Sequence, residues 1–243
     1  MKAIILAAGM GKRMKDITLN KPKPLLEVAN TTIIEYLVTC LKEIGIRQIY
    51  VVTGYKSKMI KSKLGNSVNY IHNKKFKSTN SIYSLYLAKK YLYKSNFILM
   101  NGDIFLSKVF LSKVANFKHS ISFGIKRKKY LNGEMNIILN KNIIKEISKD
   151  IRHDQSNAES AQISYFTKKD ANILFKKIYQ LIKEKCFNLF PAYAYQAIIQ
   201  KSKLKISFIK PKCWFEIDNK KDLVKLRKKI KTPKQLEKFK NLK

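Results

Sequence analysis

Apolar residues recur along this chain in two alternating patterns, short unbroken runs and longer segments with helical spacing. The runs at residues 2–6, 48–53 and 97–100 are typical of buried strands. The segment 31–44 carries its apolar positions on one face of a helix, and Gly45 ends that helix. Strands that alternate with helices predict a parallel sheet with helices on both faces. Further strands are expected at 67–71, 120–125, 162–166, 204–209 and 214–217, and further helices at 56–64, 80–91, 167–185, 189–200 and 220–230.

The pattern changes after residue 125. Residues 135–139 and 142–148 are expected to form the two strands of a hairpin around a short turn. We therefore predict a Rossmann-like α/β fold, with a mixed, mainly parallel sheet and a small β-hairpin subregion. Residues 1–230 are expected to make one domain, because no stretch has the composition of a linker. The lysine-rich basic tail, 231–243, is expected to be frayed.

The first predicted strand runs into a glycine loop, Leu6-Ala7-Ala8-Gly9-Met10-Gly11-Lys12-Arg13. Because glycine has no Cβ, backbone N–H groups of such a loop can approach phosphate oxygens closely. The loop lacks the Gly-Lys-Ser/Thr end of a P-loop and the third glycine of the dinucleotide fingerprint. For the glycines alone, an ordinary strand-to-helix turn with surface lysines is the better interpretation.

A second feature favours a phosphate site. Lys23 stands between Pro22 and Pro24, which restrict its backbone to an extended conformation. A lysine held in this way can supply charge where a departing pyrophosphate develops it, and Lys12 and Arg13 can add charge from the loop. We therefore expect Arg13 and Lys23 to be the catalytic groups.

Two aspartates follow predicted strands. Asp103 comes after the apolar run 97–100 and Gly102, and Asp218 follows the segment 214–217. Open α/β sheets bind ligands at the carboxyl ends of their strands, and two carboxylates there can hold one Mg²⁺ against a phosphate. The alternatives are a turn residue for Asp103 and a helix N-cap for Asp218. Acidic residues are scarce in this chain, so their presence at both strand ends favours the metal site.

These features together resemble a known family. Residues 6–13 and 22–25 match the Leu-Ala-Ala-Gly-x-Gly-Ser/Thr-Arg loop and the Pro-Lys-Pro segment of the nucleotidyltransferases, with Lys12 where that family usually has Ser or Thr. Gly102-Asp103 and Glu216-Ile217-Asp218 match its two magnesium-binding segments, in the family's order. The resemblance implies an enzyme that transfers a nucleoside monophosphate from an NTP to a phosphorylated small molecule, with Mg²⁺ as cofactor.

Within that family, residues 77–85 resemble the Thr-Asn-x-x-x-Ser-Leu segment of the branch that includes CTP:phosphocholine and aminoethylphosphonate cytidylyltransferases. Thr79 and Asn80 open a predicted helix, where nucleotide contact and plain N-capping are equally well supported. Residues 145–149 and 159–163 resemble acceptor strands of the branch, with Gln162 where the branch commonly has Gly. The branch implies CTP as donor and a small phosphate or phosphonate acceptor such as phosphocholine or aminoethylphosphonate.

Three further residues are candidates for the acceptor site. Trp214 can hold an ammonium group on its ring face, and Glu159 and Glu216 can pair with such a group. For the tryptophan a core position is the commoner explanation, and ordinary ion pairs explain the glutamates equally well. We expect residues 1–118 to form the nucleotide-binding half and 119–230 the acceptor-binding half. The nucleotide is expected to contact Leu6, Ala7, Ala8, Gly9, Gly11, Lys12, Thr79 and Asn80.

Charge leaves other classes of function open. The 243 residues include 51 Lys and Arg against 16 Asp and Glu, a formal net charge of +35. Such a field concentrates polyanions without specifying one, and the lysines are spread along the whole chain. We attribute the charge to compositional bias and expect no specific nucleic-acid partner. The alternatives are a sugar-1-phosphate nucleotidylyltransferase that uses UTP, dTTP or GTP, a basic nucleic-acid-binding module, and a regulatory relative that binds nucleotide without turnover.

Two features that are absent from the sequence bear on the cellular location of the protein. No apolar run approaches the length of a membrane span. Cys40, Cys186 and Cys213 are too few and too scattered for a disulfide framework or a zinc site, so reduced thiols are expected. These observations favour a cytoplasmic protein.

Overall fold

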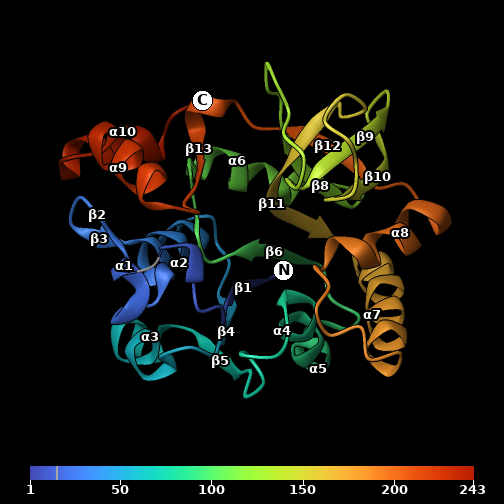
Figure 1. The fold of residues 1–243 in the computed structure, drawn as a ribbon, viewed down its shortest axis with the longest axis horizontal. Helices are drawn as coiled ribbons and strands as arrows, with labels where there is room; N and C mark the ends of the chain where they lie inside the picture. The colour runs from blue at the N-terminus through green and yellow to red at the C-terminus, as the bar shows by residue number, and fades with distance from the viewer. Residues whose placement is uncertain (15) are drawn as a thin grey trace.

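The structure, a computed structural model, describes residues 1–14 and 16–243. Its main sheet runs through the middle of the molecule and joins two sets of strands (Figure 1). The first set is β1 Lys2–Ala7, β4 Gln48–Thr53, β5 Asn69–His72 and β6 Phe97–Asn101, and the second is β8 Ile121–Ile125, β9 Asn136–Asn140, β10 Ile143–Ser148, β11 Ala158–Phe166 and β12 Lys205–Phe208. The strand order is β5-β4-β1-β6-β11-β8-β12-β10-β9.

Pairing within this sheet is mixed. β1 runs parallel to both β4 and β6, and β4 runs parallel to β5. β11 runs antiparallel to both β6 and β8, and so joins the two sets. β9 and β10 form the expected hairpin, with Lys141 in the left-handed region at its turn. The Rossmann-like α/β class with a mixed sheet is confirmed, but the sheet is parallel mainly in the first set of strands, because most pairings of the second set are antiparallel.

Helices cover both faces of the sheet because its central strands are apolar on both sides. Successive side chains of a strand point to opposite faces, so Ala3 and Ile5 of β1 enter one core and Ile4 and Leu6 enter the other. The first core includes α2 Ile33–Glu43, α3 Ser57–Leu64, α6 Lys108–Ser112, α9 Lys220–Lys229 and α10 Pro233–Lys240, and the second includes α4 Ser81–Leu87, α5 Lys89–Leu92, α7 Lys168–Lys183 and α8 Ala192–Lys201. In the described ranges, none of the helices combines the length and the apolar character needed to cross a bilayer.

A small separate sheet brings two distant segments of the chain together. β7 Ile104–Leu106 pairs antiparallel with β13 Trp214–Glu216, which places Ile104 opposite Glu216. The N–H of Ile217 donates to the C=O of Asp103 at 3.0 Å. This pairing therefore aligns the segment after β6 with the segment before α9. The remaining short elements are α1 Asp16–Leu19, β2 Glu27–Val28 and β3 Thr31–Thr32.

Most expected elements occur within a few residues of their predicted ends, with two internal differences. The helix expected at 80–91 is two helices that meet at Ala88, whose N–H bonds to the C=O of Leu85 rather than continuing the α-helical pattern. β11 begins at Ala158, not at residue 162. The sequence pattern misses the start of this strand because the pairing of β11 with β8 shifts register partway along it. The shift interrupts the alternation of apolar and polar residues by which a strand is recognised in a sequence.

The expectation of a frayed tail at 231–243 is wrong. Residues 233–240 form α10, which begins with a capping box made by Thr232 and Gln235. Near the end of this helix, the ammonium group of Lys240 pairs with the carboxylate of Glu43 in α2. Composition predicts fraying here because lysines dominate, whereas the helix is held by capping and by packing on the first core.

Replacing Phe239 by alanine is expected to lower the free energy of unfolding by about 3 to 5 kcal/mol, as for other buried phenylalanines. Phe239 is 4% exposed, and its ring centroid lies 5.5 Å from that of Phe105 and 6.0 Å from that of Phe215. Urea unfolding followed by circular dichroism measures the loss. Phe208→Ala, at a position that is 36% exposed, is the matched control, with an expected loss below about 1 kcal/mol. Equal losses in the two variants would show that α10 does not contribute a packed core residue.

Candidate active site

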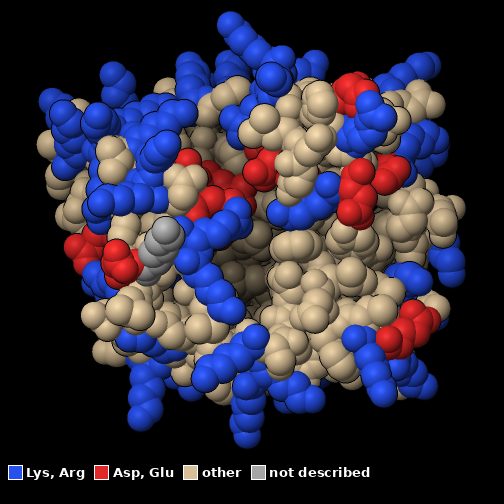
Figure 2. Space-filling view, viewed as in Figure 1, with Lys and Arg blue, Asp and Glu red and all other residues tan. Residues whose placement is uncertain are grey.

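A cleft of about 460 Å³ opens where the carboxyl ends of β1 and β6 meet. In Figure 2 it is the hollow near the centre of the molecule, with Asp and Glu side chains on its wall and Lys and Arg side chains at its rim. This is the edge at which open α/β sheets bind ligands. The cleft is lined by residues 6–13, 23, 24, 73, 76, 77, 79–81, 84, 101–103, 134, 149, 162, 190, 216 and 218.

The glycine loop forms part of the cleft wall. Gly11 has a φ of +66°, a left-handed conformation that side chains disfavour, and an added Cβ there would lie 3.2 Å from Cγ2 of Thr18. The C=O of Gly11 accepts a hydrogen bond from the Thr18 hydroxyl at 3.0 Å, which helps to fix the turn. Gly9, Lys12 and Arg13 are exposed at the cleft. The predicted loop residues therefore all lie where a ligand can reach them.

Lys23 lies at the centre of a cluster of ionised groups. Its side chain is buried, and Nζ lies 2.7 Å from Oδ2 of Asp103 and 2.9 Å from Oδ1 of Asp218. The expectation of an extended backbone at Lys23 is wrong: Pro22 is extended, but a 3-10 turn begins at Lys23 and runs to Leu25. Burial lowers the pKa of the Lys23 ammonium, but the two carboxylates outweigh burial and leave that pKa above its usual value. Lys23 is therefore a fixed cation within the cleft.

Arg13 reaches the same cluster from the glycine loop. Its Nη2 lies 3.0 Å from Oδ1 of Asp218, while most of the arginine side chain stays exposed. The interpretation of Asp218 as a helix N-cap is wrong, because the N-cap of α9 is Asn219, whose Oδ1 accepts from the N–H of Asp222 at 3.2 Å. The carboxylate of Asp218 is thus directed to Lys23 and Arg13 instead of to the helix.

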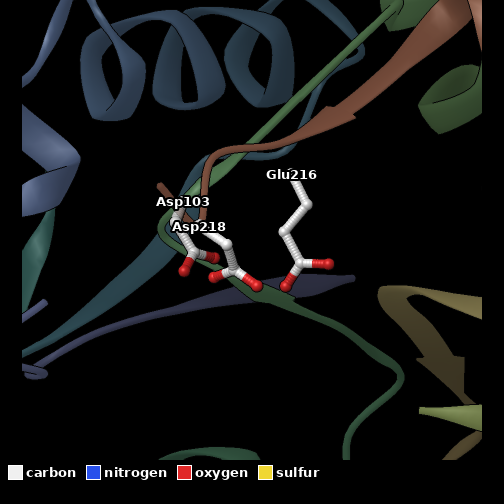
Figure 3. A group of neighbouring side chains, drawn as sticks. All are labelled: Asp103, Glu216 and Asp218. Atoms are coloured by element: carbon white, nitrogen blue, oxygen red, sulfur yellow. The ribbon is translucent and has the colours of Figure 1, made fainter. Parts of the chain in front are cut away.

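Three carboxyl groups converge beside Lys23. One oxygen from each of Asp103, Glu216 and Asp218 lies within 4.8 Å of the others, and Figure 3 shows the three side chains pointing into a common space. Asp103 Oδ1 is buried and accepts no hydrogen bond from any residue in the described part of the chain. Carboxylate oxygens are the ligands that Mg²⁺ prefers, so the donor set and the unpaired buried oxygen both fit this ion.

Glu216 connects the carboxylate cluster with the second half of the chain. Burial, together with the charges of Asp103 and Asp218, raises the pKa of Glu216 well above its usual value. The carboxylate of Glu134, which also lines the cleft, adds to this effect. The sequence predicts Glu216 at the acceptor site, and the structure places its carboxyl group beside those of Asp103 and Asp218.

Thr79 and Asn80 stand at the start of α4 and line the cleft. Asn80 Oδ1 accepts from the N–H of Ser81 at 2.7 Å, so Asn80 is the N-cap of the helix. Thr79 Oγ1 accepts a hydrogen bond at 3.2 Å from Nδ2 of Asn73, which is 1% exposed and also donates to Ser84 Oγ at 3.1 Å. Asn80 therefore caps the helix, and both Thr79 and Asn80 also line the cleft.

Glu159 and Trp214 do not belong to the described cleft lining, which corrects their expected place at the acceptor site. Glu159 forms a two-pronged ion pair with Arg127, at 2.8 and 2.9 Å. Trp214 is 4% exposed, its Nε1 donates to the C=O of Ala161 at 3.0 Å, and the Arg127 guanidinium covers its ring at 5.4 Å. Because both the ring face and the N–H already have partners, Trp214 is a core residue.

Several cleft residues belong to no motif in the sequence. Asn73, Phe76, Glu134 and Phe190 reach the cleft from loops that no motif marks. Asn73 had one usable signal, a polar side chain two residues after the strand predicted at 67–71. The others come together only through the tertiary fold.

Comparison with known proteins agrees with this geometry. The family model described as Nucleotidyl transferase matches residues 2–232. A choline-phosphate cytidylyltransferase from Haemophilus influenzae is 34% identical over 191 residues, which cover 76% of each chain. One from Streptococcus pneumoniae is 41% identical over 111 residues, 44% of this chain and 47% of that protein. A CTP:phosphoglutamine cytidylyltransferase from Campylobacter jejuni is 32% identical over 132 residues, 51% of this chain and 52% of that protein. The matches thus span about half the length of the last two relatives.

Solved structures extend the likeness over nearly the whole chain. The CTP:phosphocholine cytidylyltransferase of Streptococcus pneumoniae superposes with a TM-score of 0.79 at 27% identity, covering 93% of this chain and 97% of that one. The inositol-1-phosphate CTP transferase of T. maritima superposes with a TM-score of 0.73 at 25% identity, covering 99% of this chain and 95% of that one. The resemblance found in the sequence motifs is confirmed, and the chain belongs to the nucleotidyl transferase family.

Proposed function

We propose that this chain transfers CMP from CTP to a small phosphate or phosphonate acceptor and releases pyrophosphate. The observation that carries the proposal is the position of Lys23, whose ammonium lies between Asp103 and Asp218 beside the glycine loop. The relatives named as cytidylyltransferases support CTP as the donor. Their names also support a phosphorylated small molecule as the acceptor, with phosphocholine and aminoethylphosphonate as first candidates.

In this proposal the glycine loop binds the β and γ phosphates. Backbone N–H groups of residues 9–13 supply hydrogen bonds, and Lys12 and Arg13 supply positive charge at the exposed side of the cleft. Thr79 and Asn80 line the same cleft from the start of α4 and are assigned to the nucleoside part of CTP. The donor then lies with its α-phosphate toward Lys23.

Lys23 supplies the fixed positive charge for the reaction. Its two carboxylate partners keep it protonated, so it can stabilise negative charge that develops on the departing pyrophosphate. Asp103 and Asp218 would hold Mg²⁺, which when bound neutralises charge on the phosphate oxygens. The phosphate or phosphonate oxygen of the acceptor is already ionised at neutral pH, so no side chain has to remove a proton from it.

Pyrophosphate release measured with defined substrates tests the proposal. The purified protein is mixed with Mg²⁺, one of CTP, UTP, GTP or dTTP, and one of phosphocholine, aminoethylphosphonate or glucose 1-phosphate. Pyrophosphate is expected when CTP is combined with phosphocholine or aminoethylphosphonate, and not when it is combined with glucose 1-phosphate.

Three other outcomes separate the alternatives. Pyrophosphate only with glucose 1-phosphate and UTP, GTP or dTTP would identify a sugar-1-phosphate nucleotidylyltransferase. A thermal shift with CTP but no turnover would indicate a nucleotide-binding regulator. Salt-sensitive binding to polyanions, with no effect of any nucleotide, would favour a nucleic-acid-binding module.

A further inference from the structure

Gln162 has a backbone conformation that glutamine rarely adopts, in the middle of strand β11. Its φ is +58°, in the left-handed region that favours glycine. The other described non-glycine residues with positive φ lie in turns or at helix ends, and they are Ala29, Lys56, Lys94, Lys141 and Lys185. Among this group, Gln162 alone lies inside a strand of the main sheet.

The strand is built around this conformation. The pairing of β11 with β8 shifts register between Ser160 and Ser164, on either side of Gln162. The N–H of Gln162 donates to Oγ of Ser160 at 3.1 Å, which holds the bulge in place. Glycine would keep the same bulge without a steric cost. A strained backbone that borders a ligand cleft points to a role for the side chain that it carries.

The Gln162 amide lies in the cleft wall beside the end of β6. Its Oε1 accepts a hydrogen bond at 3.4 Å from Nδ2 of Asn101. Both N–H groups of Gln162 Nε2 are left without a partner among residues 1–14 and 16–243. Gln162 is half-buried and lines the cleft, so its side chain lies where a ligand can contact it.

Lys149 adds a cation to the same wall. Its Nζ lies over the ring of Phe190, 5.0 Å from the centroid, and both residues line the cleft. Phe190, Asn101 and Gln162 also share a side pocket of about 20 Å³, so this ring lies near the Gln162 amide. The wall thus offers hydrogen-bond donors and an ammonium. The face of Phe190 that could bind a quaternary ammonium already has a cation over it.

We propose that Gln162 determines which acceptor is used. With Lys149, its amide binds an oxygen-bearing group that the acceptor carries in addition to its phosphate or phosphonate, such as a carboxylate, a carboxamide or a hydroxyl. This inference rests on the proposed function and narrows the class of its acceptor. An acceptor that lacks such an oxygen still excludes water from this wall of the cleft, and the two N–H groups of Gln162 then have no hydrogen-bond partner. The missing hydrogen bonds weaken the binding of that acceptor.

O-phosphoserine and phosphoethanolamine test the inference because they differ only by one carboxylate. With CTP and Mg²⁺, wild-type kcat/KM is expected to be at least about tenfold higher for O-phosphoserine, as one good charged hydrogen bond predicts. Glycerol 3-phosphate carries hydroxyl-bearing groups in place of both the carboxylate and the ammonium group, so it tests a neutral oxygen. Gln162→Gly is expected to remove most of the preference through a higher acceptor KM, with little change in the KM for CTP. It should melt at the same or a higher temperature, because glycine relieves the backbone strain.

Lys141→Gly is the matched control. It places glycine at another residue with positive φ, in the hairpin turn outside the described cleft lining, and is expected to leave the acceptor preference unchanged. A wild-type preference for phosphoethanolamine over both oxygen-bearing acceptors, or an equal preference in wild type and Gln162→Gly, would overturn the inference.

Failure of the proposed function is distinguished by a binding measurement. If no acceptor yields pyrophosphate, calorimetric titration of O-phosphoserine and glycerol 3-phosphate into the protein with CTP still decides the role of Gln162. Binding to wild type that weakens in Gln162→Gly supports the inference. Equal binding to the two proteins, or no binding of either compound to wild type, contradicts it.

Discussion

Replacing Lys23 by alanine is expected to lower kcat by about 10³-fold or more while the far-UV circular dichroism spectrum stays unchanged. Lys23 Nζ is the buried cation of the cleft, 2.7 Å from Asp103 and 2.9 Å from Asp218. Alanine removes the charge that we propose stabilises the departing pyrophosphate. The measurement is pyrophosphate release at saturating CTP, Mg²⁺ and acceptor.

Lys21→Ala is the matched control for this variant. Lys21 is two positions away and exposed, and its ammonium pairs with Glu27 at 2.5 Å. Its kcat is expected to stay within about twofold of wild type, since exposed ion pairs contribute little. If Lys23→Ala kept more than a tenth of wild-type kcat, Lys23 would not be the group that stabilises the transition state.

Asp103→Asn is expected to lower kcat/KM by about 10³-fold and to raise the Mg²⁺ concentration needed for half-maximal activity, because one of the two proposed carboxylate ligands loses its charge. Asparagine keeps the size of the side chain. The fold should therefore persist. Initial rates of pyrophosphate release over a magnesium titration measure both effects.

Asp154→Asn provides the comparison on the surface. Asp154 pairs with Arg152 at 2.7 Å, and both side chains are exposed, so its neutralisation is expected to change neither the rate nor the magnesium dependence. A magnesium dependence that is the same in Asp103→Asn and wild type would exclude Asp103 as a metal ligand.

The part of the site that the sequence predicts depends on local rules. The apolar run before Asp103 predicts a buried strand, and the sheet topology places its end beside the glycine loop after the first strand. Lys23 could be singled out because two prolines restrict its backbone. Asp218 follows a strand as well, although its partner strand, β7, has no distinct pattern in the sequence.

The remaining features depend on long-range contacts. Trp214 and Glu159 have side chains that could bind an ammonium group. Arg127, however, covers the Trp214 ring and pairs with Glu159, and no local sequence pattern predicts these contacts of Arg127. The left-handed backbone of Gln162 follows from a register shift between two strands, which composition does not reveal. The docking of α10 likewise rests on contacts that composition does not reveal, among them the buried ring of Phe239 in a lysine-rich segment.

Crystals grown with CTP and Mn²⁺ in place of Mg²⁺, with diffraction data collected at the manganese absorption edge, test the proposed site most directly. We expect an anomalous peak bound by the carboxylates of Asp103 and Asp218, with the CTP phosphates against residues 9–13. CTP bound outside the cleft, or manganese bound away from both aspartates, would contradict the proposed site.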